Sequence, residues 1–213
     1  MSKSLFPYSP IEEKMNVWSH GFGAICSVFV LIVLLFKSIS SGDQVKIISS
    51  IVYGTSMVLL YTASTVYHAE TKESKRRRYK TLDHIAIFYL IAGTYTPFVL
   101  LKLPEKIGWI IFAIVWSIAA FGTVLKLKYT GKYNILSTIL YVAMGWIVVF
   151  VYNPLTENLA TEGLYWLMAG GIAYTIGAVA YVFNKLEFAH AFFHIMVLIG
   201  SFCHFWSIYH FVL

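Results

Sequence analysis

Residues 187–205 read EFAHAFFHIMVLIGSFCHF, an apolar run that contains His190, His194 and His204. A run of this length and hydrophobicity is typical of a helix that crosses a membrane. An imidazole inside hydrocarbon costs free energy unless its nitrogens are satisfied, so intramembrane histidines indicate a functional site. The rest of the chain must supply the partners of these three rings.

The composition of the chain is that of an integral membrane protein. Of its 213 residues, 59% are hydrophobic and only 12% are charged, whereas soluble domains carry about 25% charged residues. Such a chain lacks the polar residues to cover a water-facing surface. Cys26 and Cys203 both lie in apolar runs, which predicts two buried thiols rather than a disulfide.

Apolar stretches long enough to cross a bilayer, about 20 residues each, recur along the whole chain. They lie near residues 17–36, 47–68, 84–101, 107–125, 134–152, 164–183 and 188–211. Backbone groups in hydrocarbon must bond within their own segment, so we expect these spans to be helices. The loops between them are short. The sequence therefore predicts an all-α integral membrane protein, with residues 1–213 forming a single seven-helix transmembrane domain.

The basic residues predict the orientation of this bundle. The side that holds the N-terminus and the loops after the second, fourth and sixth spans carries twelve of the sixteen Lys and Arg residues, and the other side carries four. Cytoplasmic loops are enriched in Lys and Arg. We therefore expect a multi-pass protein of the cytoplasmic membrane, with its N-terminus cytoplasmic and its C-terminus outside. The run KESKRRRYK (72–80) is interpreted as part of this topology signal, in contact with anionic lipid, and no nucleic-acid partner is expected.

This topology places five polar residues in the cytoplasmic leaflet. The second span ends at His68, with Ser64 one turn deeper, and the third begins at Asp83. His190 and His194 lie in the first two turns of the seventh span, about 40° apart around the helix and about 6 Å apart along it. Two imidazoles at this spacing can share a metal, and His68 would complete a set of three. Three histidines plus a water are typical of catalytic zinc sites.

Asp83 and Ser64 are then expected to serve the chemistry of that site. Asp83 would hydrogen-bond the water or a ligand imidazole, and Ser64 would hold a water or a substrate carbonyl. Taken singly, each residue has a plainer interpretation. A histidine pair can bond backbone carbonyls or lipid headgroups, a serine can bond its own helical turn, and an aspartate can cap a helix. Their common depth in the membrane favours the metal site.

The remaining histidines are interpreted as lying outside the ligand set. His204 is ten residues beyond His194, about 15 Å deeper, and is expected to make a hydrogen bond between helices. His20 is expected to support the site or to pack beside it. His84 is expected to point elsewhere, and His210 to have a structural role near the outer surface.

At these residues the sequence resembles the progestin/adiponectin receptor family, and most closely its bacterial branch, the hemolysin III proteins. The resemblance lies in STVYH (64–68), Asp83 and HAFFH (190–194), with SHGFGA opening the first span and TLDHIAIFYLIAGTYTP in the third. It covers essentially the whole chain. In that family three histidines bind zinc and the aspartate contacts the zinc water, which implies these roles for His68, His190, His194 and Asp83. The wider superfamily includes alkaline ceramidases, which implies hydrolysis of a lipid amide.

Three functions follow as hypotheses. The first is a zinc hydrolase that acts on an amide or ester bond of a membrane lipid, with Asp83 as proton acceptor. The second is a sensor or regulator of membrane state in which zinc only joins helices. The third is a hemolytic pore-former, although the spans carry no charged residues outside the proposed site that would line an aqueous path. The sequence leaves open the substrate and the oligomeric state.

Overall fold

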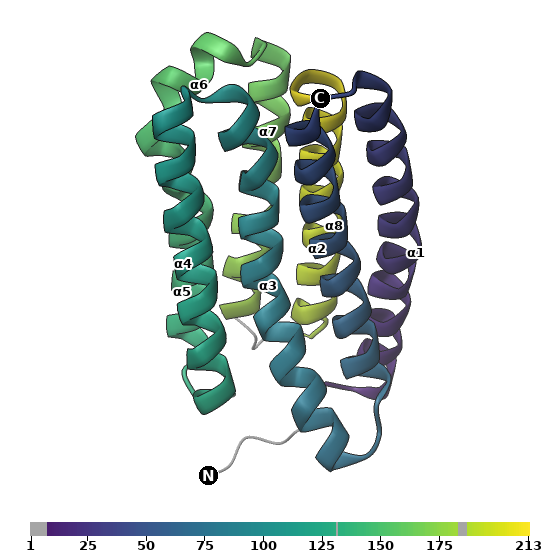
Figure 1. Ribbon diagram of the computed structural model, residues 1–213. Coiled ribbons are helices and arrows are strands. Elements are labelled where there is room, and N and C mark those ends of the chain that lie inside the picture. The colour runs from purple at the N-terminus through teal and green to yellow at the C-terminus, as the bar shows by residue number, and fades with distance from the viewer. Residues whose placement is uncertain (1–7, 131, 183–186) are drawn as a thin grey trace.

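The structure is a computed structural model that describes residues 8–130, 132–182 and 187–213 (Figure 1). Seven helical segments are long and apolar enough to cross a membrane, which confirms the predicted all-α, seven-span fold. The elements are α1 (Pro10–Ser41), α2 (Gln44–Ala69), α3 (Glu73–Lys102), α4 (Glu105–Tyr129), α5 (Asn134–Gly145), η1 (Trp146–Val151), α6 (Tyr152–Asn158), α7 (Thr161–Val182), α8 (Ala189–Ser207) and η2 (Ile208–Val212).

Local sequence signals set the first helix boundaries. Ser9 caps α1, its hydroxyl accepting a hydrogen bond from the Glu12 amide at 3.2 Å, and Pro10 occupies the first helical position. α1 ends at Gly42, which adopts a left-handed φ of 68° that costs glycine little. The next residue, Asp43, caps α2 through the amide of Val45 at 2.8 Å. Capping residues on both sides thus make a tight turn between two long helices.

Two helices extend beyond the apolar stretches that the sequence predicted. α1 begins at Pro10 rather than near residue 17, and α3 begins at Glu73 rather than near residue 84. The run 73–80 is rich in Lys, Arg and Glu, which are good helix formers. The helix therefore continues through this charged segment, and most of the predicted loop after the second span is helical.

The fifth span is interrupted rather than continuous. α5 ends at Gly145 and gives way to the 3₁₀ segment η1, followed by α6. The Tyr95 hydroxyl of α3 lies in this break, donating to the Gly145 carbonyl at 2.7 Å and accepting from the Val148 amide at 2.8 Å. A side chain inserted into the helical hydrogen-bond ladder is a known cause of such kinks.

The contacts between the helices form a closed ring. α1 packs on α2, α2 on α3 and α3 on α4, while α5 contacts α3 and α7, α7 packs on α8, and α8 returns to α1. The first and last spans are therefore neighbours. The end of the bundle where α1, α3 and α8 begin and α2 ends is called the histidine end below. It lies at the bottom of Figure 1.

α1 has its polar face inside the bundle and its apolar face outside. Trp18, Phe22 and Ile25 are exposed, whereas Asn16 and His20 are buried. A soluble bundle has the opposite arrangement, because its polar residues face water. The inward polar residues of α1 lie where the other helices can hydrogen-bond them. This pattern, together with the seven apolar spans, makes the chain a multi-pass membrane protein.

Candidate metal centre

Three imidazoles converge at the histidine end of the bundle. His68 comes from the last turn of α2, and His190 and His194 come from the first two turns of α8. The Nε2 atom of His190 lies 3.2 Å from Nε2 of His68 and 3.1 Å from Nε2 of His194. All three side chains are buried, and one nitrogen of each lies within 4.8 Å of the others, a grouping that could hold a metal ion.

The neighbours of His68 determine which of its nitrogens carries the proton. Its Nδ1 lies 2.7 Å from Oε2 of Glu13 and 3.4 Å from the Asn16 amide nitrogen. An ionised carboxylate can only accept a hydrogen bond, and a charged partner at the shorter distance dominates a neutral one. Nδ1 of His68 is therefore the donor, and Nε2 presents its lone pair to the other two rings.

The same reasoning applies to His194. Its Nδ1 lies 3.3 Å from the Ser19 hydroxyl, which itself donates to the Asn16 carbonyl at 3.1 Å. The single hydroxyl hydrogen of Ser19 is thus used, so Ser19 accepts from Nδ1 of His194. Nε2 of His194 then also presents a lone pair. A single N–H on Nε2 of His190 can satisfy only one of two such neighbours, whereas one cation would satisfy all three nitrogens. The donor set therefore fits a metal ion.

The third ring, His190, is held by stacking and through its backbone. Its backbone amide donates to Oε1 of Glu12 at 3.1 Å, and the Tyr8 ring stacks on it at 4.4 Å between centroids. Burial raises the pKa of the Tyr8 phenol well above its usual range, so this ring stays neutral. Nδ1 of His190 is buried and has no hydrogen-bond partner among the described residues. The orientation of the His190 ring therefore depends on α8, which carries it, and on the stacked Tyr8 ring.

The start of α8 is stabilised by a carboxylate from another helix. Phe188 precedes α8 with a left-handed φ of 62° and offers no capping side chain. A helix begins with backbone amides that have no intrahelical partner and carries a partial positive charge there. The Glu12 carboxylate, bonded to the amide of His190, supplies both the acceptor and the negative charge. The first turn of α1 thus fixes the helix that bears two of the imidazoles.

Arg76 links the same region to the end of α2. Its side chain is 1% exposed and forms an ion pair with Glu13, the partner of His68. It also donates to three carbonyls at the end of α2, those of residues 67, 68 and 70, at 3.0 to 3.3 Å. These carbonyls have no intrahelical donors. Arg76 therefore closes the end of α2 and holds the carboxylate that orients His68.

Sequence reasoning missed these supporting residues. Arg76 was counted only as one charge of the topology signal, and residues 10–16 were placed before the first span. The available signal was the spacing of Glu13, Asn16 and His20, three and four residues apart on one face of a helix that is apolar elsewhere. A polar stripe on an apolar helix indicates a face directed toward other polar groups.

Ser64 and Asp83 lie beside the three histidines but are not part of the close group of nitrogens. Both line the cavity that His190 and His194 also line, and the two side chains are close enough to interact. Asp83 does not cap α3, because α3 begins ten residues earlier, at Glu73. It is buried three turns into the helix. Asp83 therefore lines the cavity beside the histidines without belonging to the group that could hold a metal ion.

The other histidines fall into distinct environments. His20 stacks on His194 with centroids 3.6 Å apart, and neither of its nitrogens has a partner in the described part of the chain. His84 was expected to point elsewhere, but it lines the same cavity as Asp83. His204 makes the expected contact between helices, to the Leu167 carbonyl at 3.1 Å. His210 is exposed and packs on the nearby Trp206 ring.

Both cysteines are free, and no disulfide joins them, as the sequence predicted. Cys203 is buried and Cys26 is half-buried.

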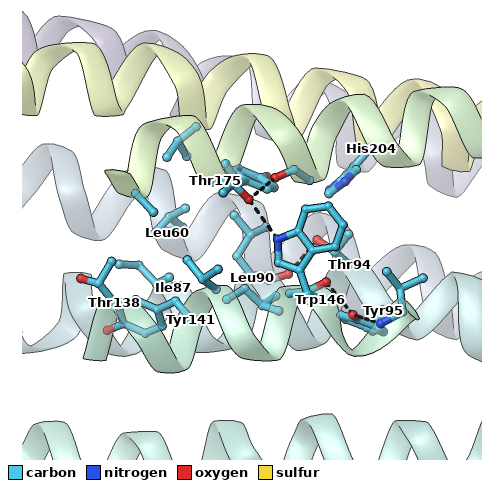
Figure 2. Close-up of a pocket in the computed structure, with 18 of the residues that line it drawn as sticks. Leu60, Ile87, Leu90, Thr94, Tyr95, Thr138, Tyr141, Trp146, Thr175 and His204 are labelled. Carbon is cyan, nitrogen blue, oxygen red and sulfur yellow. Dashed lines mark hydrogen bonds between the residues drawn. The ribbon is translucent and has the colours of Figure 1, made fainter. Parts of the chain in front are cut away.

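A cavity of about 170 Å³ leads away from the three histidines. Its lining runs along α3 from Asp83 at the histidine end to Leu103 at the other. Figure 2 shows its middle part, where Leu60, Ile87 and Leu90 are among the lining residues. The Trp146 indole donates to the Thr175 hydroxyl at 3.0 Å across this part of the cavity. The space is mostly apolar and joins the imidazole cluster to the interior of the bundle.

Comparison with known proteins identifies relatives along most of the chain. Residues 8–205 match the family model described as Haemolysin-III related. The chain is 40% identical over 202 residues to Hemolysin-3 of Bacillus cereus, covering 95% of this chain and 92% of that protein. It is 38% identical over 190 residues to the Hemolysin-3 homolog of Bacillus subtilis (strain 168), covering 89% of each.

A more distant relative extends the link to animals. The human monocyte to macrophage differentiation factor is 28% identical over 208 residues, which cover 93% of this chain and 83% of that protein. This similarity supports the predicted connection to the progestin/adiponectin receptor family. With a family model matching nearly its full length and a seven-span bundle around three buried histidines, the chain belongs to the haemolysin III-related family of membrane proteins.

Proposed function

We propose that this protein is a zinc-dependent hydrolase that cleaves an amide or ester bond of a membrane lipid. The observation that carries the proposal is the convergence of three imidazole nitrogens beside an apolar cavity that Asp83 and Ser64 also line. Three protein ligands leave one position of tetrahedral zinc open, as in catalytic sites. A zinc ion held there would polarise a carbonyl and supply an acidified water.

Zinc is the metal that the donor set favours. The close group contains only imidazole nitrogens, and Asp83 lies outside it. Imidazole suits zinc and several later transition metals, whereas calcium and magnesium prefer oxygen. Glu13 on Nδ1 of His68 is also the type of carboxylate–histidine contact that accompanies zinc ligands. The metal content of the purified protein tests this assignment.

Asp83 and Ser64 would divide the proton transfer and the binding of the carbonyl. Asp83 accepts a proton as the oxygen of the attacking water adds to the carbonyl carbon. Ser64 donates a hydrogen bond to the carbonyl oxygen. The carbon–nitrogen or carbon–oxygen bond then breaks, and Asp83 returns the proton to the departing amine or alcohol. The products are a fatty acid and the amine or alcohol from which it was released.

The cavity supports a lipid as the substrate. Its walls are mostly apolar, and its polar groups near the histidines include Asp83, Ser64 and His84. An acyl chain lying in this space would bring its carbonyl to the histidine end. Small-molecule sites commonly combine an apolar lining with a few convergent polar groups in this way.

A second candidate, a sensor in which zinc joins helices, is supported by the links around the site. His68 and His190 connect α2 to α8, while Glu12 and Glu13 attach α1 to both helices. A metal at the junction of three helices would stabilise their packing whether or not it is catalytic. This candidate predicts that removal of the metal unfolds the protein and that no lipid is turned over.

The pore-forming hypothesis has less support. The name of the Bacillus cereus relative, Hemolysin-3, suggests it. Among the described residues, however, the ionisable groups that line the cavity lie mainly at the histidine end, and the remaining lining is largely apolar. An ion path needs charged or carbonyl-lined walls along its length.

Substitution of Asp83 separates the enzyme from the sensor. Asp83→Asn is expected to retain bound metal and to lower hydrolysis about 10²–10⁴-fold, because a general base is lost. The assay is the release of free fatty acid from ceramide-like and glycerolipid substrates in detergent or vesicles. Asp43→Asn is the matched control, since Asp43 caps α2 and asparagine caps equally well.

Two results would contradict the enzyme. One is a folded, zinc-loaded protein that releases no fatty acid from any lipid of the panel. The other is an Asp83→Asn variant as active as the wild type. Either result, combined with unfolding on metal removal, would leave the sensor as the better-supported function.

A further inference from the structure

A buried lysine faces the cavity near Asp83. Lys126 lies in the last turn of α4, is only 2% exposed and lines the cavity. Among the described residues, no carboxylate oxygen lies within 4.0 Å of its ammonium group and no hydrogen bond satisfies it. The centroid of the Tyr141 ring lies 5.9 Å from its ammonium nitrogen. The ammonium group is thus buried without a direct ion pair or hydrogen bond among the described residues.

The position of Lys126 in its helix does not explain this burial. A lysine near a helix C-terminus interacts favourably with the helix dipole and usually extends to the lipid headgroups. Lys128, two residues further on, behaves in this way, because it is exposed at the end of the helix. Lys126 points inward instead. Burying an ammonium group is costly unless an anion compensates, so the geometry indicates that an anion completes the site.

The groups around Lys126 are suited to an anion. Nδ1 of His84 is buried and lacks a partner in the described structure. Lys80 is close enough to interact electrostatically with Lys126, as is Asp83. The hydroxyl of Tyr141 is already committed to the His84 carbonyl at 2.8 Å, so the ammonium and the imidazole are the groups left to bind a ligand.

We propose that Lys126 and His84 bind the phosphate group of a phosphoglycerolipid. The inference rests on the proposed function, because the same lipid would place its ester carbonyl at the histidines and its acyl chain in the cavity. Lysine is a common phosphate ligand. A neutral amide lipid would offer Lys126 no counter-charge, whereas a phosphate offers several acceptor oxygens. The substrate class is therefore an anionic ester lipid.

The length of the cavity fits this lipid. The lining includes both Asp83 and Leu103, which are 20 residues apart on α3 and so about 30 Å apart along the helix axis. The hydrocarbon core of a bilayer, which holds two layers of acyl chains, is about 30 Å thick. One acyl chain from one leaflet can therefore lie within the cavity while its head stays at the histidine end.

Binding of a lipid analogue that cannot be hydrolysed tests the proposal independently of turnover. The probe is an alkyl glycerol phosphate, with an ether bond in place of the ester and bromine on its chain, and the neutral probe is the same molecule without phosphate. Trp146 lines the cavity, so bromine bound there quenches its fluorescence. The Trp146→Phe variant gives the background from the other tryptophans. The full-length, metal-loaded protein in detergent is used throughout.

The phosphate probe is expected to bind at least tenfold more tightly than the neutral probe. Lys126→Gln is expected to lose about tenfold in affinity for the phosphate probe, since a hydrogen bond to a charged group is lost, and to bind the neutral probe unchanged. Lys126→Arg is expected to bind the phosphate probe more tightly than the neutral probe, as the wild type does. Lys128→Gln removes the same charge from an exposed site and is expected to bind both probes as the wild type does.

Several results would overturn the assignment. Equal binding of both probes by the wild type would exclude an anion site, and an unchanged preference in Lys126→Gln would place the phosphate elsewhere, for example at the three histidines. Displacement of the probe by an equal concentration of inorganic phosphate would indicate a free-phosphate site instead of a lipid site. If Lys126→Gln does not fold, Lys126→Met provides the same comparison. Because neither probe has an ester, failure of hydrolysis leaves these outcomes unaffected.

Discussion

A single carboxylate, that of Glu13, determines the direction in which His68 presents its lone pair. Glu13 accepts from Nδ1 of His68 at 2.7 Å and is itself held by Arg76. Without an acceptor at Nδ1, the proton of a neutral imidazole can move to Nε2, which would remove the lone pair that a metal needs. The carboxylate thus prepares the ring before any metal binds.

Glu13→Gln is accordingly expected to weaken metal binding about 10–100-fold, the range seen when a partner of a ligand histidine is removed. Competition with a chelator of known affinity measures this change. Glu73→Gln is the control, because Glu73 is exposed in the first turn of α3. Equal metal affinity of Glu13→Gln and the wild type would show that Glu13 does not orient His68.

The histidines themselves provide a second prediction. Alanine substitution of His68, His190 or His194 is expected to abolish stoichiometric metal binding, because each removes one of three ligands. His204→Ala and His210→Ala are expected to keep the metal, since these rings lie outside the close group. Metal analysis of the five purified variants tests both expectations. Loss of metal in the latter two variants, with retention in the first three, would show that the ligands are assigned to the wrong residues.

At this scale, the sequence predicted the three converging histidines because their depth follows from helix order and spacing. It did not predict Glu12 or Arg76, because their contacts depend on how three helices meet in space. His84 was misplaced for a related reason. The angle around a helix gives the direction of a side chain relative to its neighbour, but not the position of a cavity formed by other helices.

Among the elements, the interrupted fifth span shows how one side chain shapes a helix. The Tyr95 hydroxyl bonds both a carbonyl and an amide at the break between α5 and η1. In a membrane interior no water replaces such a bond. The kink also places Trp146, the first residue of η1, against the cavity. One hydroxyl therefore contributes to the shape of the proposed lipid site.

Tyr95→Phe is expected to destabilise the protein by about 1–3 kcal/mol, because it removes two hydrogen bonds to the backbone at the break. The loss appears as a lower Tm in detergent. Tyr89→Phe is the matched control on the same helix, since Tyr89 makes a ring contact with Trp116 but no described hydrogen bond through its hydroxyl. A Tyr95→Phe variant as stable as Tyr89→Phe would show that the hydroxyl does not hold the break.

The sequence predicted the number and type of the elements better than their ends. Seven apolar runs indicate seven spans, because a bilayer imposes both length and hydrophobicity. The start of α3 was placed too late because hydropathy marks only the apolar part of a helix. α3 also includes the charged residues 73–80. The break near Gly145 has no local signal strong enough to predict it, because its cause lies on another helix.

At the scale of the whole molecule, orientation is the prediction on which the proposed lipid chemistry depends. The excess of Lys and Arg at the histidine end predicts that this end is cytoplasmic. Reporters fused to the two termini are expected to show the N-terminus in the cytoplasm and the C-terminus outside. Finding both termini on one side would contradict an odd number of spans. The reverse orientation would place the histidines near the outer headgroups.

The ring of helices has a consequence for how the protein is made. His68 lies in the second span, whereas its two partners lie in the seventh, and Glu12 and Glu13 reach them from the first. The spans enter the membrane in order during synthesis, so Glu13, His68 and Arg76 are in the membrane before His190 and His194 are made. The group of three histidines that could hold a metal forms only after the seventh span has packed against the first and second. Loading of the site would thus mark the completed molecule, and a chain stopped before its seventh span would remain without metal.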